Sequence, residues 1–197
     1  MDIVQAAYEG NVQLVKQYLT NENEINKRNE YGETALHSVL MGIVDNPEQS
    51  EVGLMIVRLL LSTNIDKNAK DNKGQTALFI AAITNQREIT AELLKNKVDV
   101  DITNDNNESA LSFVLALQHT NDQYGYIIDL LRRNGAQWPE SSYSVAHTQA
   151  QSPEYFHSNH GMFKGSNEKS ISEINSHPAN NFEEYQQEFQ HYLPKFS

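Results

Sequence analysis

The side chains best suited to chemistry lie in the C-terminal quarter of the chain, in the stretch EYFHSNH. Glu154, His157 and His160 supply carboxylate and imidazole groups of the kind that bind Zn²⁺. The surrounding residues carry no helix signal and no supporting carboxylate in a fixed register. Five of the seven histidines fall in this polar region, so its composition also explains the cluster. We predict no metal site, and keep an enzymatic or metal site in the C-terminal extension as the less favoured alternative.

Other catalytic signatures are missing. The stretch GSNEKS at 165–170 lacks the second glycine beside the lysine of a phosphate-binding loop. No Gly-x-Ser-x-Gly elbow occurs, and the absence of cysteine removes thiolate nucleophiles, thiolate metal sites and disulfides. One histidine, His37, stands at the start of a predicted helix, where we expect a structural role. We therefore predict no catalytic residue, no cofactor and no enzyme activity.

The helices and turns that would position any site are predicted from a stretch of sequence that recurs along the chain. KGQTALFIAA at 73–82 nearly copies YGETALHSVL at 31–40, and NNESALSFVL at 106–115 is a weaker copy. The interval from Thr76 to Ser109 is one period, and the longer interval from Thr34 to Thr76 is one period plus an insertion. AAYEGNVQLVKQYL at 6–19 aligns with AAITNQREITAELL at 81–94. We divide the chain into four units, which are 1–33, 34–75, 76–108 and 109–138.

A period of about 33 residues with a Thr-Ala-Leu-His signature resembles the ankyrin repeat. The resemblance implies an all-α solenoid of about four helix-turn-helix repeats, in which each unit buries its apolar face against its neighbours. It also implies that His37 bonds the backbone of a turn. Phe79 and Ser112 replace that histidine in the later units.

The residues of each unit agree with this architecture. Gly32 and Gly74 stand where a turn needs positive φ, and Asn107 replaces them in unit four. Thr34, Thr76 and Ser109 are predicted to cap the first helix of their units. Apolar residues spaced by three and four predict one buried stripe on each second helix.

Two units carry insertions between their paired helices. The first lies in IVDNPEQSE at 43–51, where Asn46, Pro47 and Gln49 have the spacing of a helix start. We predict that it lengthens the second helix at its beginning. The second lies in HTNDQYG at 119–125, and both are expected on the edge away from the turns.

Composition limits the partners. The net charge is −11, which argues against binding to a phosphate backbone and is compatible with a basic protein partner. The most apolar window, LMIVRLLL at 54–61, is too short to span a membrane, and the N-terminus has no signal-peptide pattern. We predict a cytoplasmic, monomeric chain.

After Trp138 the composition changes. Residues 142–197 hold nine aromatic residues but only four Val, Ile or Leu. Within this extension, 139–197, a helix is predicted near 181–193. Its apolar face contains Phe182, Tyr185 and Phe189, which we predict to dock on the repeats.

The resemblance also places the partner-binding surface. Ankyrin proteins usually bind through a concave face made of the turn tips, or fingers, and the exposed side of each first helix. Carried over to this chain, the candidate residues are Tyr8, Glu30, Tyr31, Glu33, Met41, Lys73, Gln75, Ile83, Asp105, Glu108 and Leu117. The function implied is protein–protein interaction.

The last residues, FEEYQQEFQHYLPKFS, are similar to the glutamate-rich C-terminal signals of Dot/Icm-type type IV secretion effectors, a class rich in ankyrin proteins. This similarity implies secretion of the chain into a host cell, where it would act as a bacterial effector. The alternative is a resident cytosolic adaptor, or an inhibitor of a neighbouring protein.

Overall fold

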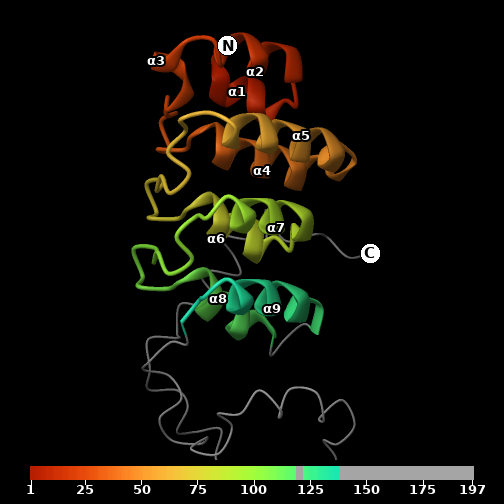
Figure 1. The fold of residues 1–197 in the computed structure, drawn as a ribbon, viewed down its shortest axis with the longest axis vertical. Helices are drawn as coiled ribbons and strands as arrows, with labels where there is room; N and C mark the ends of the chain where they lie inside the picture. Colours follow the sequence, from red (N-terminus) through yellow and green to blue (C-terminus); the bar gives the residue numbers. More distant parts are fainter. Residues whose placement is uncertain (119–121, 138–197) are drawn as a thin grey trace, which may run out of the picture. The chain divides into compact units, whose positions relative to one another are not determined.

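The computed structural model describes residues 1–118 and 122–137, and within them it is all-α, as predicted. Helices pair in succession along the chain, and the pairs lie one above another in Figure 1. The elements are α1 (Ile3–Tyr8), α2 (Val12–Tyr18), α3 (Glu22–Ile25), α4 (Ala35–Asp45), η1 (Pro47–Gln49), α5 (Ser50–Leu61), α6 (Ala77–Ile83), α7 (Arg87–Lys95), α8 (Ala110–Gln118), η2 (Asp122–Tyr124) and α9 (Gly125–Arg133).

Each first helix after α1 is preceded by a hydroxyl side chain, as the repeat predicts. Thr76 Oγ1 accepts the backbone N–H of Phe79 at 3.2 Å, and Ser109 Oγ accepts that of Ser112 at 3.2 Å. Thr34 also precedes its helix, but its backbone N–H bonds His37. The cap satisfies a backbone group that the first turn leaves unpaired, so the helix starts at the same place in each unit.

The core lies between the layers. Small residues on the first helices, Ala6 and Ala81, are fully buried, which lets neighbouring helices approach closely. The predicted stripes on the second helices are buried as well. They include Val15, Ile56, Val57, Leu60, Ile89, Leu93, Leu94, Ile127, Ile128 and Leu131. First helices pack on first helices (α1, α4, α6, α8), and second helices pack on second helices (α2, α5, α7, α9).

The insertion in unit two lengthens the second helix at its start, as predicted, and it also lengthens the first helix, which was not predicted. Helix α4 has 11 residues against 7 in α6, and α5 has 12 against 9 in α7. Pro47 does stand at the first position of a helical turn, but the Asn46 side chain makes no capping bond and that turn is the 3-10 turn η1. Ile43 on α4 lies against Gly53 on α5, where a Cβ atom would come within 2.2 Å of the isoleucine Cδ1 atom, so the two helices approach closely there.

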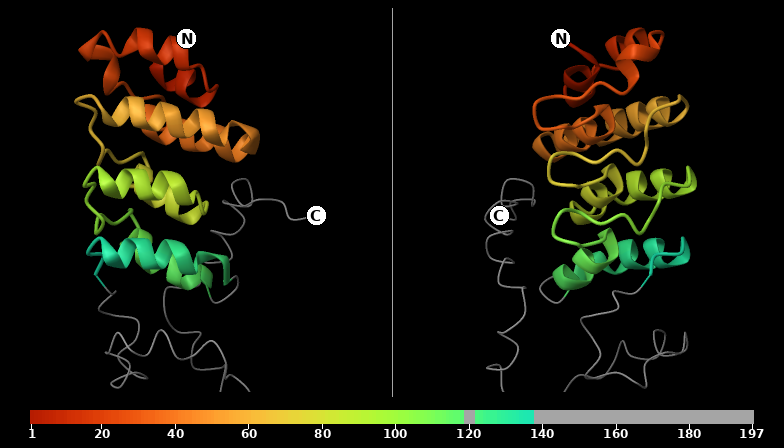
Figure 2. Two further views of the ribbon diagram at one scale, coloured as in Figure 1. Left: turned by 45° about the vertical axis from the view of Figure 1, so that its right-hand side comes forward. Right: turned by 90° about the vertical axis from the view of Figure 1, so that its left-hand side faces the viewer.

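Successive units are joined by a repeated hydrogen bond on the side of the stack where the connecting loops lie, which we call the loop edge. Three side chains in the same register each accept a backbone N–H from the next unit, and we call these bonds the loop clamps. They run from Asp66 N to Asn26 Oδ1 (2.7 Å), from Asp99 N to Asn68 Oδ1 (3.0 Å) and from Gln137 N to Asp101 Oδ1 (2.9 Å). In Figure 2 these connecting loops lie on one side of the helices, opposite the turns that join paired helices.

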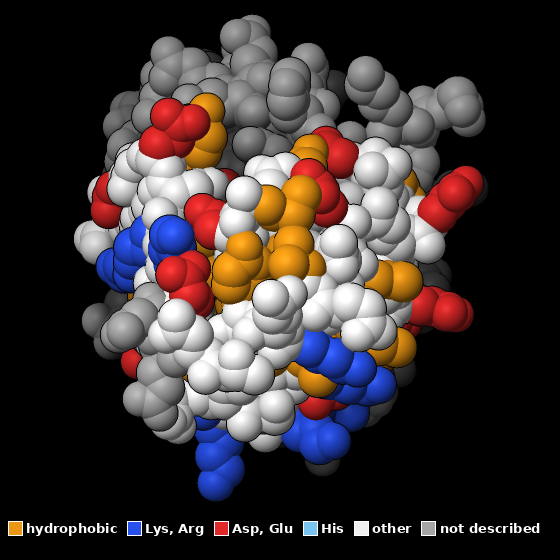
Figure 3. Space-filling model, turned by 90° about the horizontal axis from the view of Figure 1, so that it is seen from above, with side chains coloured by type: hydrophobic (Ala, Val, Ile, Leu, Met, Phe, Trp, Pro, Cys, Tyr) orange, Lys and Arg blue, Asp and Glu red, His pale blue; other side chains and the backbone are white. Residues whose placement is uncertain are grey.

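The outward surface of unit one is less buried than the same surface of unit three. Leu14 and Tyr18 are half-buried, whereas Ile89 and Leu93 at the same places in unit three are buried. Figure 3 looks onto this N-terminal end, where apolar side chains gather near the centre. The end unit therefore retains positions that an interior unit covers with its neighbour.

Candidate functional site

The fingers are built by one repeated set of bonds. Asn29, Asp71 and Asn104 each use Oδ1 to accept two backbone N–H groups, two and four residues further along. Gly32 (φ +73°), Gly74 (φ +72°) and Asn107 (φ +66°) then turn the chain in the left-handed region, which confirms the prediction for these positions. Each finger is thus stabilised by hydrogen bonds within itself, independently of its contacts with neighbouring units.

Neighbouring fingers are also bonded to each other. The backbone N–H of Asn72 donates to the Tyr31 carbonyl at 3.0 Å, and that of Asp105 donates to the Lys73 carbonyl at 3.1 Å. These bonds hold the tips in a row, so that side chains from different units share one surface. Among the predicted site residues, this row exposes Glu30, Tyr31, Lys73 and Asp105.

Three predicted finger residues are less accessible than expected. Gln75 is 3% exposed, because its N–H bonds Asp71 and its carbonyl oxygen accepts a bond from His37. Glu33 and Glu108 are half-buried, and their carboxylates accept the side-chain amides of Asn29 (2.7 Å) and Asn104 (3.0 Å). Burial raises the pKa of the Glu108 carboxyl, and the bond from Asn104 opposes that shift. Their exposure was predicted wrongly, since both carboxylates close the finger.

On the first helices the prediction of exposure is right for one residue and wrong for two. Tyr8 is 37% exposed and Met41 is half-buried, but Ile83 and Leu117 are buried. The hydroxyl of buried Tyr124 donates to the Ile83 carbonyl at 2.8 Å, so the η2 turn lies against the end of α6. Leu117 stands in the last turn of α8, the helix that packs on both η2 and α9. The unit-four insertion thus covers positions that a regular repeat would leave open.

His37 is fixed between two units. Its Nε2 lies 3.0 Å from the Gln75 carbonyl, which can only accept, so Nε2 carries the proton. Its Nδ1 then accepts the Thr34 N–H at 3.2 Å and lies 2.9 Å from the Thr34 hydroxyl. Burial lowers the pKa of this imidazole, and the bond to Gln75 opposes the shift. The side chain joins a helix cap to the next finger, which is the structural role that the resemblance implies.

This arrangement predicts a pH dependence of stability. The pKa of His37 is lower in the folded state than the value of about 6.5 in the unfolded state. The contribution of His37 to the free energy of unfolding is therefore complete above about pH 6.5, and it is lost as the pH falls through the folded-state pKa. His37→Phe, which copies Phe79, should remove this dependence. Urea denaturation of both proteins from neutral to acidic pH should show the His37 protein losing stability relative to the Phe variant as the pH falls. A constant difference would contradict the assigned protonation state.

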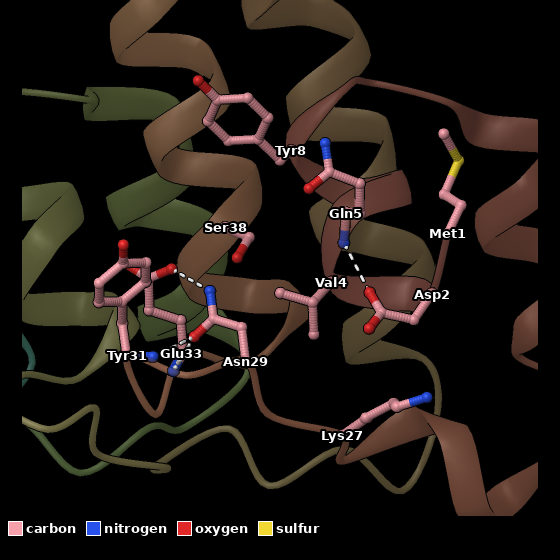
Figure 4. A pocket seen from close by; sticks show the side chains of 10 residues that line it. All are labelled: Met1, Asp2, Val4, Gln5, Tyr8, Lys27, Asn29, Tyr31, Glu33 and Ser38. Atoms are coloured by element: carbon pink, nitrogen blue, oxygen red, sulfur yellow. Dashed lines mark hydrogen bonds between the residues drawn. The ribbon is translucent and has the colours of Figure 1, made fainter.

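One pocket brings several predicted residues together. It has a volume of about 620 Å³ and lies where α1, the first finger and α4 meet. Figure 4 shows Tyr8 at one side, Tyr31 and Glu33 at another, and Val4 and Ser38 between them. The remaining lining residues are Met1, Asp2, Gln5, Lys27 and Asn29. Tyr8, Tyr31 and Glu33 are thus neighbours in space, whereas Lys73 and Asp105 lie on later fingers.

Two features of the structure were not predicted from the sequence, namely the loop clamps and the bond between Tyr8 and Asp45. The loop clamps have a readable signal, because Asn26, Asn68 and Asp101 recur at the same two intervals as the caps Thr34, Thr76 and Ser109. The bond from the Tyr8 hydroxyl to Asp45 Oδ2 had no signal, since it joins residues 37 positions apart and depends on the lengthened α4.

Within 1–118 and 122–137, no group of three or more His, Cys, Asp or Glu side chains is arranged to hold a metal. No helix in these ranges is both long and apolar enough to cross a bilayer. Glu154, His157 and His160 lie outside the described residues, as do Phe182, Tyr185 and Phe189. The docking of the extension stays a prediction.

Stacked helix pairs joined by hydrogen-bonded fingers define a helical-repeat solenoid, a class in which each unit is stabilised by its neighbours. A family model described as ankyrin repeats (3 copies) matches residues 3–104 and, in an overlapping match, residues 40–138. The chain belongs to the ankyrin repeat family. A search of curated proteins found no match to the chain. Ankyrin repeats are generally protein–protein interaction modules, typically non-catalytic, which favours a protein as the partner.

Proposed function

We propose that the chain is a non-catalytic module that binds a protein partner through the face formed by its fingers and first helices. The observation that carries this proposal is the row of fingers, in which backbone bonds between units hold exposed side chains of three units on one surface. Glu30, Tyr31, Lys73 and Asp105 contribute from the fingers and Tyr8 from α1. A surface organised over several units suits a macromolecule better than a small substrate.

The charge of the exposed tips favours a basic partner. Glu30 and Asp105 are exposed, and their side chains take no part in closing the fingers. Carboxylates at such positions attract a positively charged partner over a distance and raise its association rate. We propose that the chain works as a monomer, because a single stack already presents the complete row.

The partner can be captured and the surface tested with one design. A photo-crosslinking residue replaces Tyr31, 63% exposed on the first finger, or Tyr126, 50% exposed on α9. A partner crosslinked from position 31 and not from position 126 is identified by mass spectrometry. Its binding to the uncrosslinked chain is then measured.

The double substitution Glu30→Lys and Asp105→Lys should slow association with that partner about tenfold at low salt and weaken the salt dependence. The melting temperature should hold, since both side chains are exposed. Glu48→Lys with Glu51→Lys makes the same charge change in η1 and α5 and should leave association nearly unchanged. Equal effects of the two pairs would show that net charge, and not this surface, governs binding.

We further propose that the chain is an effector that acts in a host cell. The support is the similarity of its C-terminal sequence to type IV secretion signals, and these residues lie outside the described part of the chain. The alternative is a resident cytoplasmic adaptor or inhibitor. Parallel captures from host lysate and from lysate of the source cell would separate the two, since only one should contain a saturable partner.

A further inference from the structure

The pocket between unit one and unit two has the features of a site for a single side chain. Tyr8 comes from the end of α1 and Tyr31 from the tip of the first finger, so two aromatic rings face the same space from different elements (Figure 4). Val4 and Ser38 are buried and form the floor between them. Tyr31 is 63% exposed, so its ring is accessible to a partner.

The tyrosine and carboxylate positions are set by bonds within the chain. The Tyr8 hydroxyl bonds Asp45, which orients its ring from outside the pocket. Glu33 accepts the Asn29 amide through Oε2, and Asp2 accepts the Gln5 N–H through Oδ1. These bonds hold two carboxylates at the pocket while each has a second oxygen. The site is therefore organised before any ligand arrives, which lowers the entropy cost of binding.

The charge of the lining favours a cation. Asp2 and Glu33 line the pocket, and exposed Glu30 precedes Tyr31 on the same finger. The positive groups of the lining residues are the amino group of Met1 and the Lys27 ammonium, which is 3.3 Å from the Glu24 carboxylate. That ion pair offsets the positive charge of Lys27. An anionic ligand would meet two carboxylates, whereas a cation would be attracted by them and by the faces of the two rings.

We propose that this pocket binds an arginine side chain of the partner. The inference rests on the proposed protein-binding function and names the group that the partner inserts. A guanidinium is planar, so it stacks on a tyrosine ring while its N–H groups bond carboxylates at the edge. A lysine ammonium is a compact and strongly hydrated charge, which gains less from stacking. Ser38 and Gln5 belong to the same lining, and their side-chain oxygens are further candidate acceptors.

The test titrates the full chain with a small probe, N-acetyl-arginine methylamide, and measures binding by NMR. Its uncharged twin contains citrulline, which keeps the shape and removes the charge. We expect the arginine probe to bind weakly and saturably, with shifts concentrated on Gln5, Tyr8, Tyr31 and Ser38. The citrulline and lysine probes should bind about tenfold more weakly, through loss of the charge in one and of the stacking in the other.

Two variants and a control connect the signal to the pocket. Tyr31→Ala and Glu33→Gln should each weaken the arginine probe severalfold, and Glu33→Gln retains the oxygen that accepts the Asn29 amide. Tyr126→Ala removes a similarly exposed tyrosine on α9 and should leave binding unchanged. Thermal melting of each variant shows whether a loss reflects unfolding.

Four results would overturn the assignment: no saturation at high probe concentration, equal binding of the citrulline twin, equal binding of lysine, or shifts centred away from the pocket. None of these would refute the proposed function, because crosslinking from position 31 does not depend on an arginine. If crosslinking fails while the arginine probe binds as expected, the pocket stands and the protein-binding surface is wrong.

Discussion

Gly42→Ala is expected to destabilise the chain by about 3 kcal/mol. Gly42 lies in α4 where the end of α1 crosses it. A Cβ atom at this position would come within 2.1 Å of the Tyr8 carbonyl oxygen and 2.9 Å of its carbonyl carbon. The obstacle is backbone, so it cannot be relieved by a rotamer change, and α1 must move away from α4.

Thermal and urea denaturation of the full chain measure this effect, and a fall in melting temperature of roughly 10 °C corresponds to it. Gly125→Ala is the matched control, because no atom lies within 4 Å of the Cβ that it would add at the start of α9. That control should be neutral or slightly stabilising, since alanine favours a helix over glycine. Similar melting of both variants would show that α1 and α4 do not approach as closely as described.

The same variant should affect the pocket. Tyr8 and Gln5 are carried by α1, whereas Ser38 is carried by α4. A shift of α1 therefore separates the two walls of the site. We expect Gly42→Ala to weaken the arginine probe at a temperature where the variant is still folded.

Gly74→Ala is the second large effect, and we expect a loss of about 2 to 3 kcal/mol from two causes that add. The φ angle of Gly74 is +72°, which an alanine adopts only at a cost. The new Cβ atom would also lie 2.7 Å from the Asp105 backbone nitrogen. That nitrogen is the donor of the bond to the Lys73 carbonyl, so the substitution breaks the row of fingers between units two and three.

Asn107→Gly is the control for the second experiment. Asn107 has a φ of +66° at the equivalent place in the next finger, so glycine should be neutral or stabilise by about 0.5 kcal/mol. Hydrogen exchange at Asp105 should be faster in Gly74→Ala and unchanged in Asn107→Gly. Protection of Asp105 in both proteins would mean that the fingers adjust to the added methyl group.

Features that depend on a few neighbouring residues were predictable from the sequence. The caps at Thr76 and Ser109 and the turns at Gly74 and Asn107 follow from the chemistry of one residue and its register in the repeat. The register itself predicted the order of the helices and their pairing. Such local rules apply equally to every unit, so the copies reinforce one another.

Features that depend on departures from the repeat were not predictable. Ile83 was expected to be exposed because its place in a regular unit is open, but Tyr124 comes from an insertion 41 residues away. The pocket likewise needs the start of α1, the first finger and α4 to meet in space. An alignment of units shows which residues are equivalent, and it does not show how unequal units fit against each other.

The loop clamps and the bonds between fingers lie on the same edge of the stack, and this has a mechanical consequence. Asn26, Asn68 and Asp101 tie each unit to the next there through bonds from short side chains to backbone N–H groups. At the opposite edge the bonds between units come from longer side chains, such as Gln86 Nε2 to the Leu40 carbonyl and the Tyr124 hydroxyl to the Ile83 carbonyl. A long side chain can follow a small movement by rotating about its several bonds, whereas a short side chain bonded to backbone has less freedom and its hydrogen bond weakens when stretched. The described residues should therefore bend most easily with the loop edge as the fixed axis, so that the bending stiffness differs between directions. A partner seated on the fingers would meet the stiffer edge, and thermal motion would be largest at the turns between paired helices.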